Sequence, residues 1–227
     1  MNERGDFIAA SLQGVKERVH IACHKAGRDP MEVTLISVTK NFPATDVQIL
    51  YELGERNFGE NRDQEAREKS AALPSDAIWH FQGHIQSKKL RSITGWADVI
   101  HSLDDLSHAS KIAGLLLEKS LSVFVQVSLD APDGGDGRGG VEPARLTEFL
   151  RECARLPGLE LQGLMAVAPL AHDPAEAFFH LAALRREVTG EFPQLVSLSC
   201  GMSGDFEAAI AAGATHIRVG SSILGSR

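Results

Sequence analysis

The first strand-like segment of the chain is Val33-Thr34-Leu35-Ile36-Ser37-Val38-Thr39-Lys40, in which six of the eight residues are apolar or β-branched. Such a run predicts a strand that is buried on both faces, as in a parallel sheet. The run ends on Lys40, and Asn41-Phe42-Pro43 stops the strand because proline has no backbone donor. Thr45 and Gln48 have capping-box spacing and predict the start of a helix. Lys40 is therefore expected where strands pass into helices, the edge at which α/β proteins bind ligands.

Length, composition and charge indicate one soluble globular domain. The chain has 227 residues, 43% hydrophobic and 23% charged, and fits one domain spanning 1–227 better than two. Its formal net charge of −7 argues against nucleic acid or an anionic membrane as a partner. No signal peptide or membrane-spanning stretch is expected. Because Cys23, Cys153 and Cys200 form no C-x-x-C pair, we expect reduced thiols and a cytoplasmic location.

Strand and helix signals alternate along the whole chain. Strands are expected at 33–40, 56–59, 78–82, 98–101, 121–129, 159–165, 195–198 and 215–219. Helices are expected at 6–26, 44–53, from 61, around 88–91, at 103–119, from 143, at 173–189 and at 203–212. Asn61, with Gln64 at the capping-box position, and Asp173 are expected to cap their helices. Eight strands alternating with eight helices predict an α/β protein with a closed (β/α)8 TIM barrel.

Two motif-like spacings have simpler structural explanations. His20 and His24 lie four residues apart on the first helix without a third ligand nearby, and a glycine interrupts His80 and His84, so no metal site is predicted. The glycine-rich stretch 132–140 has glycines at the spacing of a dinucleotide-binding motif. It lacks the acidic residue expected on a second strand, so it predicts a loop.

Small-residue turns follow each of the last two predicted strands, at 199–205 and 218–222. Small residues let backbone N–H groups approach an anion, and in such barrels the loops after strands seven and eight form the usual phosphate site. The eighth strand of a closed barrel neighbours the first, so Lys40 is expected beside Gly220 and Ser221. A lysine next to a phosphate cup predicts a phosphorylated aldehyde held as a Schiff base, and pyridoxal 5'-phosphate (PLP) is the obvious candidate.

A set of motifs spread over nearly the whole chain also matches a known family. The motifs are LISVTK at 35–40, FGEN at 58–61, WHFQGHIQ at 79–86, GLMA at 163–166, LSCGMSGD at 198–205 and RVGSSILG at 218–225. Together they resemble the pyridoxal phosphate homeostasis proteins (the YggS/PROSC type), which are single-domain relatives of the alanine racemase barrel. The resemblance implies an alanine racemase N-terminal domain-like fold, PLP fold type III.

The resemblance also implies roles for individual residues. Lys40 matches the cofactor lysine of the family. The cofactor-binding residues implied besides Lys40 are Asn61 near the ring, Arg218 at the pyridine nitrogen, and Ser203, Gly204, Gly220 and Ser221 at the phosphate. Departures from the family pattern are Gln82 in place of an aliphatic residue, Ser87 in place of an asparagine, and the glycine-rich loop, in which Arg138 stands for a lysine and which is a candidate lid.

Three functions share a lysine beside a phosphate cup: a PLP carrier, an amino-acid racemase of the alanine racemase type, and a Schiff-base aldolase acting on a sugar phosphate. An arginine at the ring nitrogen stays protonated and makes the ring a poorer electron sink. A racemase also needs a second acid/base, and Tyr51, the only tyrosine, is expected on a helix outside the barrel. We therefore expect a monomeric protein of intracellular PLP homeostasis, with no catalytic residue, that serves PLP-requiring apo-enzymes.

Overall fold

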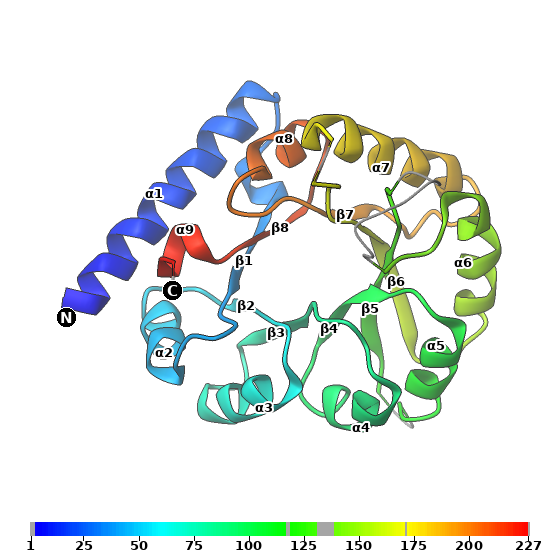
Figure 1. Ribbon diagram of the computed structural model, residues 1–227, viewed down its shortest axis with the longest axis horizontal. Coiled ribbons are helices and arrows are strands. Elements are labelled where there is room, and N and C mark those ends of the chain that lie inside the picture. The colour runs from blue at the N-terminus through cyan, green and yellow to red at the C-terminus, as the bar shows by residue number, and fades with distance from the viewer. Residues whose placement is uncertain (1–2, 117–118, 131–138, 171, 227) are drawn as a thin grey trace.

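The computed structural model describes residues 3–116, 119–130, 139–170 and 172–226, and its strands form a closed parallel barrel in chain order (Figure 1). The strands are β1 Thr34–Val38, β2 Asn57–Glu60, β3 Ile78–Phe81, β4 Val99–Leu103, β5 Leu121–Gln126, β6 Leu159–Met165, β7 Ser197–Ser199 and β8 His216–Val219. Because β8 pairs with both β7 and β1, the ring closes between the two ends of the chain. The predicted (β/α)8 barrel is confirmed.

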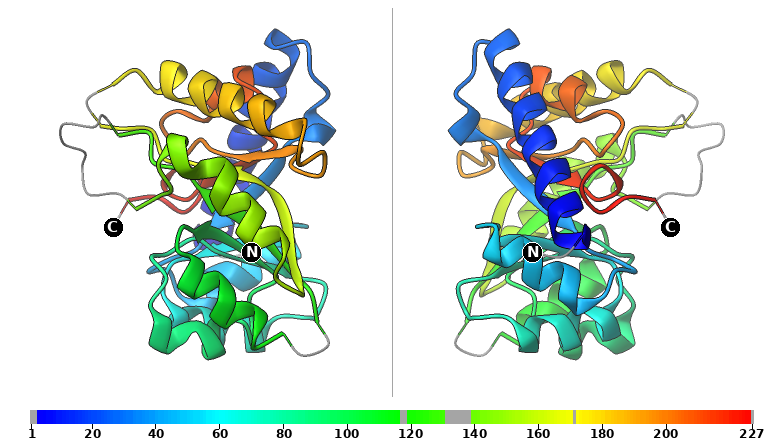
Figure 2. Two further views of the ribbon diagram at one scale, coloured as in Figure 1. Left: turned by 90° about the vertical axis from the view of Figure 1, so that its right-hand side faces the viewer. Right: turned by 90° about the vertical axis from the view of Figure 1, so that its left-hand side faces the viewer.

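Helices surround the ring of strands (Figures 1 and 2). They are α1 Glu3–Lys25, α2 Ala44–Glu52, α3 Asp63–Ala72, α4 Leu90–Ile93, α5 Leu106–Ala113, α6 Leu146–Ala154, α7 Pro174–Thr189, α8 Phe206–Ala211 and α9 Ser221–Leu224, with 3₁₀ turns at Pro30–Glu32, Ser87–Lys89 and Pro143–Arg145. α1 packs against α2, α8 and α9, so it covers the seam where β1 meets β8. No helix in the described ranges is long and apolar enough to cross a bilayer.

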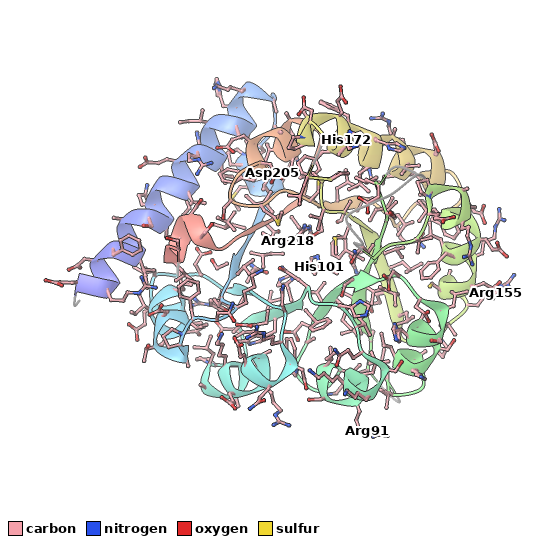
Figure 3. All side chains as sticks on the ribbon, viewed as in Figure 1. Arg91, His101, Arg155, His172, Asp205 and Arg218 are labelled. Atoms are coloured by element: carbon pink, nitrogen blue, oxygen red, sulfur yellow. The ribbon has the colours of Figure 1, made fainter. Side chains whose placement is uncertain are left out.

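The interior of the barrel is polar, whereas such barrels are ordinarily filled by branched apolar side chains. His101 on β4 and Ser199 on β7 are joined by a 2.8 Å hydrogen bond between Nδ1 and Oγ. Because β4 and β7 are not neighbours in the ring, this bond crosses the interior. Figure 3 shows His101 and Arg218 together inside the ring. The barrel therefore encloses hydrogen-bonding groups in its buried interior.

Local signals predicted some helix starts correctly and others not. Asp173 caps α7 by accepting a hydrogen bond from the backbone of Ala175, as expected. The capping box of Thr45 and Gln48 is wrong, because α2 begins after Pro43, so that Thr45 lies inside the first turn and Gln48 donates to Glu52 instead.

Sequence analysis did not anticipate the short helix α9, which the chain forms after β8. The lid predicted for the glycine-rich loop at 134–140 falls largely on residues outside the described part of the chain, Arg138 among them.

Gly163 on β6 provides a direct test of how closely neighbouring strands approach. A Cβ added at Gly163 would lie 1.9 Å from the carbonyl oxygen of Ser197 on β7, so Gly163→Ala should lower the free energy of unfolding by more than about 3 kcal/mol. Gly14→Ala on α1 is the matched control: a Cβ there meets nothing within 4 Å, and the change should stabilise the helix by about 1 kcal/mol. Urea unfolding of both variants measures the difference, and equal stabilities would contradict this packing.

Candidate cofactor site

The turn after β1 carries Lys40. The strand ends at Val38, so the lysine lies two residues beyond it rather than on the strand as its sequence suggested. Thr39 is fully buried, whereas Lys40 is exposed. Asn41 follows with φ of 65°, the only non-glycine residue in the described ranges with a positive φ. Within those ranges the Lys40 side chain makes no hydrogen bond or ion pair, so its amine is available to a ligand.

The predicted phosphate cup forms from two loops that lie side by side. The Oγ atom of Ser203, in the loop after β7, accepts hydrogen bonds from the backbone N–H groups of Gly220 (3.3 Å) and Ser222 (3.4 Å) after β8. A Cβ at Gly220 would come within 3.1 Å of the carbonyl oxygen of Val38, so the cup adjoins the end of β1. The barrel thus brings Lys40's strand to the loops that sequence analysis assigned to the phosphate.

Gly204 and Ser221 complete the predicted cup, and the space around them differs from that around Gly220. A Cβ at Gly204 would meet nothing within 4 Å. Ser221 is exposed and opens α9. The backbone of this part of the cup is therefore approachable, which the close approach of an anion requires.

Arg218 on β8 is a buried cation, with only 5% of the residue exposed. Its guanidinium donates to the carbonyl oxygen (2.7 Å) and Oγ (2.8 Å) of Ser199 and to the carbonyl oxygen of Ala166 (3.1 Å). No carboxylate in the described ranges forms an ion pair with it. Burial lowers the pKa of Arg218 from its ordinary value, an effect partly opposed by the negative charge of Asp205. A buried guanidinium with only neutral partners is costly and still has donor capacity for a ligand.

Two histidines extend the hydrogen bonding of Arg218 across the barrel. Oδ1 of Asn57 can only accept, so His80 Nε2 donates to it (3.0 Å) and Nδ1 of the neutral His80 accepts from His101 Nε2 (2.9 Å). His101 Nδ1 then accepts from the Oγ of Ser199, which in turn accepts from Arg218. Every donor points away from Arg218, and each ring keeps one proton. The chain of bonds holds both histidines neutral and gives Ser199 a fixed orientation.

Asn61 does not occupy the helix-capping position that the sequence predicted for it. α3 begins at Asp63, with Arg62 in the N-cap position, so Asn61 lies outside the helix and does not cap it. Its Oδ1 is buried without a hydrogen-bond partner in the described ranges, and so is Nε2 of Gln82, its neighbour one residue beyond β3. Unsatisfied polar atoms of this kind are costly and require an explanation such as a ligand or water.

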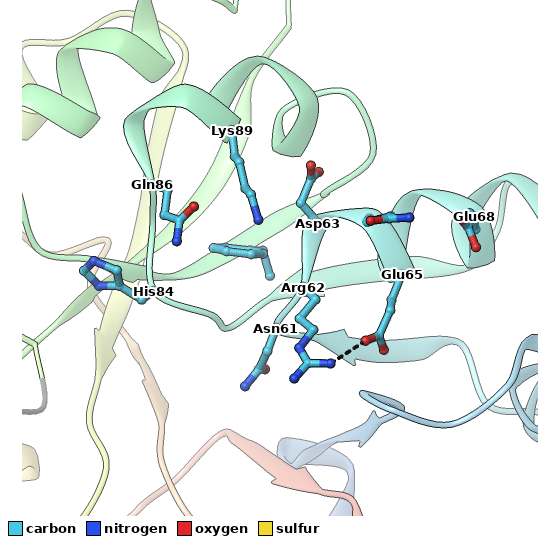
Figure 4. A pocket seen from close by; sticks show the side chains of 10 residues that line it. Asn61, Arg62, Asp63, Glu65, Glu68, His84, Gln86 and Lys89 are labelled. Atoms are coloured by element: carbon cyan, nitrogen blue, oxygen red, sulfur yellow. Dashed lines mark hydrogen bonds and ion pairs between the residues drawn. The ribbon is translucent and has the colours of Figure 1, made fainter.

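A hollow of about 520 Å³ lies next to Asn61, between the start of α3 and the segment that precedes α4 (Figure 4). Gln86 and Lys89 enter it from one side and Asp63 and Glu65 border the other. Lys40, Arg218 and the cup do not line it. This hollow and the candidate cofactor site therefore have only Asn61 in common.

Sequence analysis missed several residues that organise the site. His80, His101 and Ser199 were not assigned to it. The signal that could have found them is the alternation of side chains along a strand, because every second residue of a barrel strand points inward. Within the described ranges, no three His, Cys, Asp or Glu side chains are grouped so that they could hold a metal ion.

Comparison with known proteins identifies the family. Residues 11–227 match the model of the alanine racemase N-terminal domain. The pyridoxal phosphate homeostasis protein of Mycobacterium tuberculosis strain H37Rv is 39% identical over 248 residues, covering 99% of this chain and 95% of that protein. The chain belongs to the alanine racemase N-terminal domain family, among its pyridoxal phosphate homeostasis proteins.

Solved structures of the family have the same fold. The structure of PipY from Synechococcus elongatus with PLP bound has a TM-score of 0.83 and 36% identity, covering 96% of this chain and 100% of that one. An unknown protein from Bifidobacterium adolescentis has a TM-score of 0.91 and 28% identity, covering 98% and 96%. The barrel of this chain therefore matches nearly the whole length of both structures.

The buried histidines predict a loss of stability on mild acidification. Burial lowers the pKa of His80 to about 3, that of His216 to about 4 and that of His101 well below its ordinary 6.5. The unfolded chain takes up these three protons near pH 6.5, but the folded protein does not. The free energy of unfolding should therefore fall as the pH is lowered from about 6.5 to 5, by roughly 1 kcal/mol per pH unit for each histidine.

Urea unfolding at a series of pH values measures this slope. His80→Asn removes one of the three buried rings, so its slope should be about two thirds of that of the unchanged protein. Identical slopes in the two proteins would contradict the neutral, buried state of His80.

Proposed function

We propose that the protein binds PLP as a Schiff base on Lys40, holds it reversibly and supplies it within the cell, with little or no turnover of its own. The observation that carries this proposal is the buried guanidinium of Arg218, which lacks an anionic partner and lies on the strand paired with that of Lys40. The ring nitrogen of PLP is a hydrogen-bond acceptor that matches this donor. A relative, PipY, has a structure with PLP bound.

The other residues fit the remaining parts of the cofactor. Ser203, Gly204, Gly220 and Ser221 would hold the phosphate, with open space at Gly204 and Ser203 joining the two loops. Asn61, with its unpartnered oxygen, would lie near the ring.

Bound PLP would supply an electrophilic aldehyde carbon, and the amine of Lys40 would hold it through a covalent link that hydrolysis can reverse. The exposure of Lys40 would give water or another amine access to that link.

The placement of Tyr51 supports a carrier over the alternative of a racemase. Tyr51 lies on α2, and its hydroxyl donates to Oδ1 of Asp76 at 2.5 Å while Arg56 stacks over its ring. This hydrogen bond raises the pKa of Tyr51, which makes the hydroxyl a poorer proton donor. Two-base racemisation needs an acid/base on each face of the substrate carbon, and the single tyrosine of this chain is engaged elsewhere.

The cytoplasmic location and monomeric state remain part of this proposal. The three thiols, Cys23, Cys153 and Cys200, are all buried and unpaired. Burial raises the pKa of Cys153 and of Cys200 to about 12, so both stay protonated and unreactive. Such thiols suit a reducing compartment, in which PLP-requiring apo-enzymes are the natural acceptors of the cofactor.

The covalent link is tested by incubating the protein with PLP, reducing it with borohydride and mapping the modified peptide by mass spectrometry. We expect one adduct, on Lys40, and its loss in Lys40→Ala, which should remain folded because the side chain is exposed. An adduct that maps to Lys88 or Lys89 instead would show that the assignment is wrong.

The lack of turnover is tested by incubating the PLP-loaded protein with L-alanine in deuterated water. We expect negligible deuteration at Cα and no D-alanine, because Arg218 keeps the ring a poor electron sink and no second base is present in the described site. In parallel, the loaded protein should restore activity to an apo-enzyme that requires PLP. Rapid deuteration with formation of D-alanine would establish the racemase instead.

A further inference from the structure

The two residues that flank Lys40 are both tied to α3. Nζ of Lys69 donates to the carbonyl oxygen of Thr39 at 2.8 Å, on one side of the lysine. On the other side, the backbone N–H of Asn41 donates to Oε2 of Glu65 at 2.8 Å. One helix therefore fixes the backbone before and after Lys40, while the Lys40 side chain is exposed.

The attachment of Thr39 uses a buried ion pair. Nζ of Lys69 lies 2.6 Å from Oε1 of Glu60, with 6% and 0% of the two side chains exposed, and the Thr39 hydroxyl donates to the same oxygen at 2.6 Å. Burial raises the pKa of the Glu60 carboxyl, and hydrogen bonds from Lys69 and Thr39 partly offset the rise. Apolar residues of similar volume often stabilise a fold as well as a buried ion pair does. The stability of the fold therefore does not explain why this ion pair is present. The pair does fix both the carbonyl and the hydroxyl of Thr39.

The attachment of Asn41 holds a backbone conformation that side chains rarely adopt. Asn41 has φ of 65°, which costs energy for any residue other than glycine and persists only where the surroundings enforce it. Arg62 donates to Oδ1 of Asn41 at 2.9 Å and is paired with Glu65 at 3.0 Å, while Glu65 lies 3.7 Å from Lys69. These charges connect the two attachments into one network.

We propose that this network, the α3 clamp formed by Glu60, Arg62, Glu65 and Lys69, holds the Lys40 turn in the conformation in which the lysine reacts with a bound aldehyde. Lys69 and Glu60 are its central positioning residues, and neither needs to touch the ligand. The inference rests on the proposed function of Lys40. Because the clamp orders the turn when the protein folds, the turn loses little further conformational entropy when the covalent link forms.

Two probes separate positioning of the lysine from binding at the rest of the site. PLP can link to Lys40, whereas pyridoxine 5'-phosphate, which has an alcohol in place of the aldehyde, can occupy the cup and ring site only noncovalently. In Lys69→Met, we expect the equilibrium constant for the covalent link to Lys40, followed by its absorbance before borohydride is added, to fall at least about tenfold. Affinity for pyridoxine 5'-phosphate, measured by calorimetry, should change less than about twofold, since the cup and Arg218 are untouched.

Matched variants make the result specific. Lys69→Arg keeps a cation at the same place and should restore most adduct formation, and Arg67→Met, at an exposed position of the same helix, should leave both probes unaffected. Glu65→Ala breaks the attachment of Asn41 from a part-exposed position, so it tests the clamp should Lys69→Met fail to fold. In the ligand-free protein, ¹⁵N relaxation of the Asn41 amide should report increased motion in Lys69→Met or Glu65→Ala.

The outcomes distinguish the clamp from the function on which it rests. Normal adduct formation in Lys69→Met or Glu65→Ala would overturn the clamp and leave the proposed function intact. Equal losses for both probes would also overturn it, because that result describes general damage to the site. No adduct on Lys40 in the unchanged protein would overturn the proposed function and the clamp together.

Discussion

The parallel pairing of β1 with β8 joins residues from the two ends of the chain, and the whole candidate site depends on it. In its register Ile36 is opposite Arg218 and Ser37 is opposite Val219, so the turn of Lys40 follows directly beside the loop of Gly220. Parallel strands end at the same edge, which gathers the lysine, the arginine and both small-residue loops at one mouth of the barrel. α1 covers this seam from outside, which protects the pairing.

The polar interior of the barrel has a cost that a stable fold alone does not require. Arg218, His101 and His80 are withdrawn from water, and hydrogen bonds to neutral partners offset only part of that desolvation. These hydrogen bonds all have their donors on the side of Arg218, so they also fix the orientation of its guanidinium. An acceptor presented by a ligand would complete the bonding of Arg218, which links the stability of the free protein to the chemistry of its site.

The same logic applies on the outside of the barrel, at α3. A buried pair of charges and a strained asparagine are both concentrated around one exposed lysine. Costly features that cluster at one place are characteristic of functional sites, where the surrounding fold enforces a conformation that the local chain would not adopt by itself. Lys40 is thus an exposed side chain on a constrained backbone.

The sequence by itself determined the (β/α)8 barrel, because alternating apolar runs and turn residues are local signals, and its motifs indicated Lys40, Arg218 and the two small-residue loops. Only the tertiary structure decided that Asn61 leaves α3 uncapped, that Lys40 lies beyond its strand, and that Lys69 and Glu65 hold its turn. The His80–His101–Ser199 bonds are likewise invisible in sequence. The physical reason is that these contacts join residues distant along the chain, whose meeting depends on barrel closure and strand register rather than on local preference.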